Sequence, residues 1–199
     1  MNLNPTTKIF IIEGIAGAGK STLHQQLLEQ LKEKTIYDYP EEATLFSWKH
    51  AWIPNIDQLR LDFFGKLLDY SEQIIKEDPT AVFIISRFHI SYAIFCLTPY
   101  SQNQQYKQII ERISRLPAQL YIPVVETADI EQRSSHKERT EKIWQYHLQK
   151  RLEQKNFKSI TEMYETEQRK ILQLAQEQEI PFIIIKQKVK ESNNKKIKK

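Results

Sequence analysis

The 199-residue sequence has one cysteine, four glycines and no long apolar run. The single cysteine, Cys96, excludes both a disulfide framework and a cysteine-based metal site. No apolar stretch approaches the roughly 20 residues needed to span a bilayer, and residues 1–7 lack the charged-then-apolar pattern of a secretion signal. The five histidines show no metal-ligand spacing, and we predict no Ser/His/Asp arrangement. We therefore expect a cytoplasmic protein that does not interact with membranes.

Positive charge is concentrated at one end of the chain. The formal net charge is +4, but residues 186–199 contain seven lysines and one glutamate and carry +6, so the other 185 residues sum to −2. Such a lysine run is typical of a solvated, disordered end, and the alternative is a tether to RNA or to a membrane surface. We expect one domain over residues 1–186, a Lys-rich disordered tail over 187–199, and no nucleic-acid partner.

Three of the four glycines fall within the eight residues Gly14-Ile15-Ala16-Gly17-Ala18-Gly19-Lys20-Ser21. An apolar, strand-like run precedes them at residues 8–13, and an amphipathic helix is predicted over residues 22–34, so the context is strand, turn and helix. Glycine backbone N–H groups and a helix N-terminus together favour a bound polyphosphate. Lys20 would then reach the β- and γ-phosphates, and the Ser21 hydroxyl would ligate Mg²⁺. The alternative is a chance Gly/Ala-rich turn. The residues expected to bind ATP here are Gly14, Ala16, Gly17, Ala18, Gly19, Lys20, Ser21 and Thr22.

The rest of the chain alternates between apolar strands and helices. Further strands are predicted at residues 34–39, 81–85, 119–125 and 181–185. Helices are predicted at residues 57–76, 89–97, 104–116, 141–153 and 160–179, and a short one begins within 128–133. This alternation predicts a three-layer α/β fold with a five-stranded parallel sheet between helices. Ligands of such sheets bind at the carboxyl ends of the strands, so the glycine loop is expected there.

Arg87 and Glu41 are the candidate catalytic side chains beyond the glycine loop, and each follows a predicted strand. Arg87 directly follows the strand at 81–85, where its guanidinium can stabilise charge on a transferred phosphoryl group; the alternative is a surface ion pair. Glu41 and its neighbour Glu42 follow the strand at 34–39. A carboxylate there can accept the proton of an attacking hydroxyl or hold Mg²⁺ through water, and the alternative is that both acids are simply solvated.

A polar segment at residues 134–140 carries no apolar anchor and is flanked by cations. Arg133, Lys137 and Arg139 are typical of a mobile lid that brings positive charge to bound phosphates and expels water. The alternative is an ordinary solvated junction between two helices.

Aromatic side chains crowd the segment between the second and third predicted strands. They can stack on a flat acceptor such as a nucleobase, or they can be core residues; they are Phe46, Trp48, Trp52, Phe63 and Phe64. His24 lies one turn beyond Lys20, and we expect it on the helix surface rather than as a ligand.

Together these motifs resemble the thymidylate kinase and deoxynucleoside kinase group of P-loop kinases, over nearly the whole chain up to about Lys186. Four segments carry the likeness: the opening strand with the glycine loop, Pro40-Glu41, Ile85-Ser86-Arg87-Phe88, and the stretch from Arg133 to Glu141 with its basic residues. The resemblance implies strand order 2-3-1-4-5, a lid, ATP as donor, Mg²⁺ and a possible homodimer. It also implies catalytic roles for Lys20, Arg87, Glu41 and Arg139.

The chain departs from that family at two points. Ser86 stands where the family has an acid, which normally helps to hold the Mg²⁺ shell or acts on the acceptor, and residues 89–95 do not reproduce the family's polar residues.

From the motifs and the resemblance together, we expect phosphoryl transfer from ATP to a nucleoside or nucleoside monophosphate. The alternatives are a kinase for another hydroxyl (a metabolite, an antibiotic or a polynucleotide end) and a non-catalytic nucleotide-binding module.

Overall fold

Five parallel strands form one sheet in the order β2-β3-β1-β4-β5, which confirms the predicted fold class. The computed structural model describes residues 3–50, 52–95, 99–134 and 142–186. The strands are β1 (Ile9–Ile12), β2 (Thr35–Tyr39), β3 (Ala81–Ser86), β4 (Ala118–Val124) and β5 (Phe182–Lys186). Each lies within one or two residues of its predicted position, because every strand is a short apolar run next to a turn residue.

The central strands are buried on both faces. Ile9 and Ile11 of β1 pack into the larger hydrophobic cluster, while Phe10 and Ile12 pack into the smaller one on the opposite face. Successive side chains of a strand point to opposite faces, so a strand covered on both sides must be apolar throughout. This requirement explains why the sequence pattern identified β1 and β3 so clearly.

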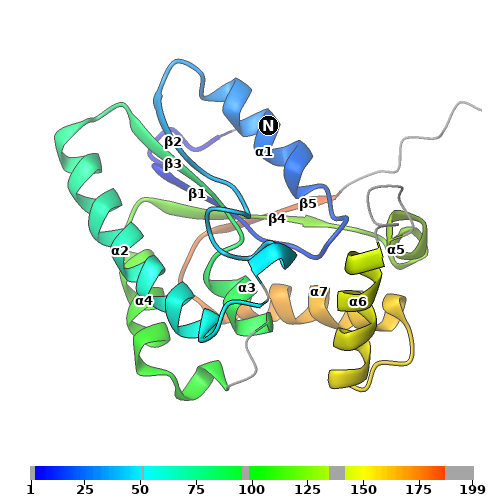
Figure 1. Ribbon diagram of the computed structural model, residues 1–199. Helices are drawn as coiled ribbons and strands as arrows, with labels where there is room; N and C mark the ends of the chain where they lie inside the picture. Colours follow the sequence, from blue (N-terminus) through cyan, green and yellow to red (C-terminus); the bar gives the residue numbers. More distant parts are fainter. Residues whose placement is uncertain (1–2, 51, 96–98, 135–141, 187–199) are drawn as a thin grey trace, which may run out of the picture.

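Helices cover the two faces unequally (Figure 1). Helix α1 (Lys20–Gln30) covers one face, and α2 (Ile56–Glu77), α3 (His89–Phe95), α4 (Gln104–Arg115) and α7 (Ile160–Glu177) cover the other. Helices α5 (Thr127–Ser134) and α6 (Lys142–Gln154) follow β4. Short 3-10 turns occupy Trp48–His50 and Tyr100–Gln102. Within these described residues, no helix is both long and apolar enough to cross a membrane.

Helices α4 and α7 each begin with a side-chain cap. The Asn103 side chain accepts a hydrogen bond from the Tyr106 N–H at the start of α4, and Ser159 accepts one from the Glu162 N–H at the start of α7. These contacts satisfy backbone donors that a helix leaves unpaired in its first turn. Helix α1 is shorter than predicted and ends at Gln30 rather than at residue 34. Residues 31–34 form the turn into β2, with Leu31 still packed in the smaller hydrophobic cluster and the three residues after it charged.

Candidate functional site

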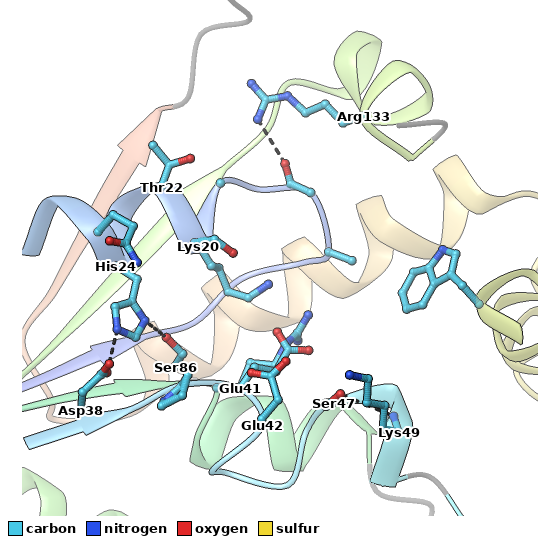
Figure 2. A pocket seen from close by; sticks show the side chains of 18 residues that line it. Lys20, Thr22, His24, Asp38, Glu41, Glu42, Ser47, Lys49, Ser86 and Arg133 are labelled. Carbon is cyan, nitrogen blue, oxygen red and sulfur yellow. Dashed lines mark hydrogen bonds and ion pairs between the residues drawn. The ribbon is translucent and has the colours of Figure 1, made fainter. Parts of the chain in front are cut away.

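A cavity of about 940 Å³ lies at the carboxyl edge of β1, β2 and β3. Its lining comes from the glycine loop and the start of α1, from the ends of β2 and β3, and from single residues of α5 and α6. Segments far apart in the sequence thus meet here, as expected for the ligand-binding edge of a parallel sheet. Figure 2 shows this cavity with its principal side chains.

The glycine loop forms one wall. Gly17 and Gly19 have φ angles of 83° and 90°, which side chains larger than glycine adopt only with strain. Helix α1 begins directly afterwards at Lys20, so the unpaired N–H groups of its first turn face the loop. Lys20 is buried, and its Nζ donates to the Ile15 carbonyl oxygen at 3.0 Å. The lysine therefore folds back over the loop, where its charge faces the same space as the backbone donors.

Arg87 and Glu41 lie on the opposite wall. Arg87 is only 5% exposed, and its Nε lies 2.8 Å from Glu41 Oε2. Burial on its own lowers the pKa of Arg87, but the carboxylates of Glu41, Glu13 and Glu167, with Glu41 contributing most, raise that pKa above its ordinary value. Arg87 Nη1 is buried without a hydrogen-bond partner among the described residues. A buried guanidinium N–H in this position is suited to an anion that enters the cavity.

Glu13, which the sequence analysis missed, holds the turn that carries Arg87. Glu13 is completely buried, and its Oε1 accepts hydrogen bonds from the N–H groups of Phe88, Ile90 and Ser91, at 2.8, 3.1 and 3.2 Å. The Ser91 hydroxyl donates to Oε2. Burial raises the pKa of Glu13, and these hydrogen bonds partly offset the effect. The available signal was an acid at the end of an otherwise apolar strand, a position that needs buried partners.

Arg87 itself has a strained backbone. Its φ of 59° is in the left-handed region, which is uncommon for a non-glycine residue. The Arg87 N–H donates to the Ile12 carbonyl oxygen at 2.9 Å, and Glu13 fixes the residues that follow. The strain is therefore held by contacts from the adjacent strand β1, and it aims the Arg87 side chain at Glu41.

His24 is not on the helix surface, and that expectation was wrong. The residue is buried, its Nδ1 lies 2.8 Å from Ser86 Oγ, and its Nε2 lies 2.7 Å from Asp38 Oδ1 (Figure 2). The expectation of no Ser/His/Asp arrangement was also wrong. In register, Asp38 is opposite Ile84, so Asp38 and Ser86 point to the face of the sheet that α1 covers. His24 meets both because it comes from α1.

With this geometry in place, comparison with known proteins is informative. No family model matches the sequence, and no curated protein matches it. The YorR protein from Bacillus subtilis, solved in complex with phosphorylated GDP, is similar in structure with a TM-score of 0.52 at 22% identity. That match covers 89% of this chain and 85% of YorR. Thymidylate kinase from Candida albicans gives a TM-score of 0.51 at 17% identity, over 92% of this chain and 85% of that one.

The fold is that of the P-loop nucleotide kinases. Deoxyadenosine kinase from M. mycoides also matches, with a TM-score of 0.45 at 17% identity over 89% of each chain. At these identities the likeness concerns the fold alone.

Arg133 reaches the P-loop from α5. Its Nη1 donates to the Gly17 carbonyl oxygen at 3.1 Å, and its side chain lies over the loop in Figure 2. A third cation beside Lys20 and Arg87 is thus placed at the cavity. Lys137 and Arg139, the other two cations of the predicted lid, lie outside the described residues.

The aromatic segment divides between core and surface. Phe64 is fully buried and Phe46 nearly so, whereas Trp52 is 58% exposed. Among the described side chains, neither these three nor Phe63 lines the cavity, and the side chain of Trp48 is outside the description. Trp144 of α6 does line it, although the sequence analysis did not select this residue. The core explanation therefore holds for Phe46 and Phe64.

Proposed function

We propose that this protein transfers the γ-phosphoryl group of ATP to a small acceptor, a nucleoside or a nucleoside monophosphate. One observation carries the proposal: the P-loop with Lys20 faces the Arg87–Glu41 pair across a single cavity. A loop alone would suit any nucleotide-binding protein. A buried arginine opposite the loop adds a group suited to a phosphoryl group in transit. The name of thymidylate kinase and the phosphorylated GDP bound to YorR agree with this substrate class.

The residues present fit a triphosphate. The positive φ angles of Gly17 and Gly19 turn the backbone of the loop into a concavity, and the start of α1 adds unpaired N–H donors. Lys20 supplies a cation within this concavity. Arg87 Nη1 supplies a buried donor without a partner among the described residues. Each of these groups favours an anion, so we assign the β- and γ-phosphates to the loop from Ala16 to Lys20.

The residues also fit Mg²⁺ in the manner of this fold. Among the described residues, no three His, Cys, Asp or Glu side chains gather around a common point. Mg²⁺ usually keeps several waters and binds substrate phosphates with few protein ligands. The Ser21 hydroxyl lines the cavity at the start of α1 and would be such a ligand. When bound, the metal would neutralise charge on the phosphates.

Catalysis in this arrangement is mainly positioning and electrostatics. Lys20, Arg87 and Arg133 would neutralise the charge that develops on the transferred group, and we expect Lys137 and Arg139 to join them. Glu41 keeps Arg87 in place through their ion pair. Its carboxylate is also a candidate for accepting the acceptor's proton or for a water-mediated contact to the metal. We further infer a cytoplasmic enzyme, with α4 as a possible contact helix of a homodimer.

Replacement of Lys20 is the first test. In Lys20→Ala, we expect ADP formation with a panel of nucleosides and nucleoside monophosphates to fall about 100-fold or more, as when a charge-stabilising donor is removed. Lys32→Ala is the matched control, because Lys32 is an exposed residue just beyond the end of α1, where its Nζ lies 2.9 Å from Glu29 Oε1 and away from the cavity. It should retain full activity. Circular dichroism melting should show that both variants remain folded.

Two results would contradict the proposal. One is an unchanged rate in Lys20→Ala with the fold intact, which would remove the loop from the chemistry. The other is a wild-type protein that binds Mg·ATP but forms no ADP with any acceptor, because such a protein would be a nucleotide-binding module.

A further inference from the structure

Asp38, His24 and Ser86 form an uninterrupted chain of polar contacts that ends in the cavity. Asp38 Oδ1 lies 2.7 Å from His24 Nε2, and His24 Nδ1 lies 2.8 Å from Ser86 Oγ. All three residues line the cavity beside the P-loop (Figure 2). His24 and Ser86 are buried, at 7% and 5% exposure. Three different elements, β2, α1 and β3, supply these side chains.

With a neutral imidazole and an ionised carboxylate, elementary hydrogen-bond chemistry gives this chain one direction. An ionised carboxylate only accepts, so His24 Nε2 carries the proton that points to Asp38. In a neutral imidazole the other nitrogen, Nδ1, then has a lone pair and accepts from the Ser86 hydroxyl. Ser86 Oγ has donated its only proton, and both of its lone pairs remain to accept a hydrogen bond from the cavity. The serine thus presents acceptor character to the cavity.

We propose that Asp38, His24 and Ser86 are a proton relay that takes up the proton of an acceptor hydroxyl during phosphoryl transfer. This inference rests on the proposed function and narrows its acceptors to alcohols. The acceptor oxygen bonds to the γ-phosphorus while the bond from that phosphorus to the β,γ-bridging oxygen breaks, and ADP leaves with that electron pair. The hydroxyl proton passes to Ser86 Oγ as the proton of Ser86 passes to His24 Nδ1. The imidazolium that forms lies beside the Asp38 carboxylate.

Charge compensation favours the relay over Glu41 as the proton acceptor. Glu41 Oε2 pairs with Arg87, which is buried. A proton on Glu41 would neutralise the carboxylate and leave the buried guanidinium without its closest counter-charge, which is costly. A proton on His24 instead creates a cation 2.7 Å from a carboxylate. Proton uptake by Glu41 would therefore break an ion pair, whereas proton uptake by His24 completes one.

The relay implies a preference among acceptors. A neutral alcohol must lose its proton as the new bond to phosphorus forms, so a nearby base accelerates its reaction. The terminal oxygens of a nucleoside monophosphate are already largely ionised at pH 7. A nucleoside, or another hydroxyl compound of that size, therefore uses the relay, whereas a monophosphate acceptor has no need of it.

The first measurement does not depend on enzymatic activity. Two-dimensional ¹⁵N–¹H spectra of the imidazole rings in the full-length protein at pH 7.5 report which nitrogen of His24 carries the proton. We expect the neutral tautomer with the proton on Nε2, and loss of that preference in Asp38→Asn. A proton on Nδ1, or on both nitrogens, would overturn the relay because Ser86 would then receive a hydrogen bond from His24. This result stands independently of whether the proposed function is correct.

The second measurement separates a relay from a structural role. In His24→Gln, we expect kcat with neutral hydroxyl acceptors, water included, to fall about 100-fold, while the KM for ATP changes by less than about twofold. Transfer to nucleoside monophosphates should be nearly unaffected. His89→Gln is the matched control, since His89 is another buried histidine but does not line the cavity. At pH 7.5 its kcat should equal that of the wild type with both classes of acceptor.

A rescue variant completes the design. In Ser86→Asp combined with His24→Gln, the new carboxylate can take the proton directly, so activity with hydroxyl acceptors should recover by at least about tenfold over His24→Gln. No recovery, or equal losses in His24→Gln for hydroxyl and monophosphate acceptors, would overturn the relay and leave the proposed function standing. A wild-type protein that forms no ADP with any acceptor, water included, would overturn both.

Discussion

The two walls of the cavity are specified in different ways. The P-loop wall is a contiguous segment, residues 14–21, whose shape depends on glycines at positive φ. The opposite wall combines Asp38, Glu41 and Arg87 from two strands and depends on buried polar contacts from Glu13 and His24. A local motif can therefore be damaged with a small loss of fold stability. Damage to the assembled wall should reduce stability and activity together.

The largest expected effect comes from the residue that joins the two walls. Glu13→Ala removes the acceptor of three backbone N–H groups and one hydroxyl, all of them buried. We expect the free energy of unfolding to fall by roughly 4 kcal/mol, with loss of activity because Arg87 is no longer positioned. Urea denaturation measures this change. Glu13→Gln keeps an acceptor oxygen and should lose clearly less, so equal, small losses in both variants would contradict the role assigned to Glu13.

A pH effect of slightly smaller size should come from α3, which begins just beyond Arg87. His89 is fully buried, and burial lowers its pKa to about 4 from the ordinary 6.5, with a hydrogen bond to Gln178 as a minor opposing effect. In the unfolded chain the imidazole takes up a proton near pH 6.5, whereas in the folded protein it does so only near pH 4. Stability from this group is thus present above pH 6.5 and is lost as pH falls toward 4.

The full contribution of His89 is roughly 3 kcal/mol. Between pH 7.5 and pH 4.5, the wild type should lose more unfolding free energy than His89→Gln does. The excess loss in the wild type should be a large part of that amount. The variant should have the flatter profile, because glutamine does not titrate. Parallel profiles in the two proteins would show that the imidazole is not buried in neutral form.

The smallest expected effect on stability lies in the P-loop wall. Gly19→Ala places a side chain at φ 90° and should cost about 1–2 kcal/mol of unfolding free energy, while weakening Mg·ATP binding through the altered loop. Gly65→Ala is the matched control, because Gly65 is in α2 and an added methyl group would meet nothing within 4 Å. That substitution should stabilise the protein by up to about 1 kcal/mol. A loss in Gly65→Ala as large as that in Gly19→Ala would contradict the conformational argument.

These differences explain what the sequence could predict. The strands and helices followed from apolar runs alternating with amphipathic segments, because these are local patterns, whereas the strand order came from the family resemblance. The glycine spacing likewise located the turn between β1 and α1. Arg87 and Glu41 were selected as residues that follow predicted strands, and the structure places Arg87 Nε 2.8 Å from Glu41 Oε2. That prediction succeeded because parallel strands bring their carboxyl ends to one edge. The catalytic roles of these residues remain proposals.

The parts that sequence reasoning missed depend on side-chain direction across elements. Whether His24 faces solvent or the sheet depends on the rotation of α1 about its axis, and a helix with several polar residues gives little indication of it. The contact with Asp38 further requires the register of β2 against β3. To select Glu13 from the sequence, one would have had to know that α3 starts directly beside β1. None of these facts has a short-range signature in the chain.

The account depends most directly on triphosphate binding at the P-loop. Calorimetric titration of Mg·ATP into the full-length protein, with Lys20→Ala and Lys32→Ala in parallel, measures it. We predict saturable binding of about one ATP per chain in the wild type and in Lys32→Ala, and strongly weakened binding in Lys20→Ala. Absence of any binding to the wild type, or equal affinity in Lys20→Ala, would contradict the account.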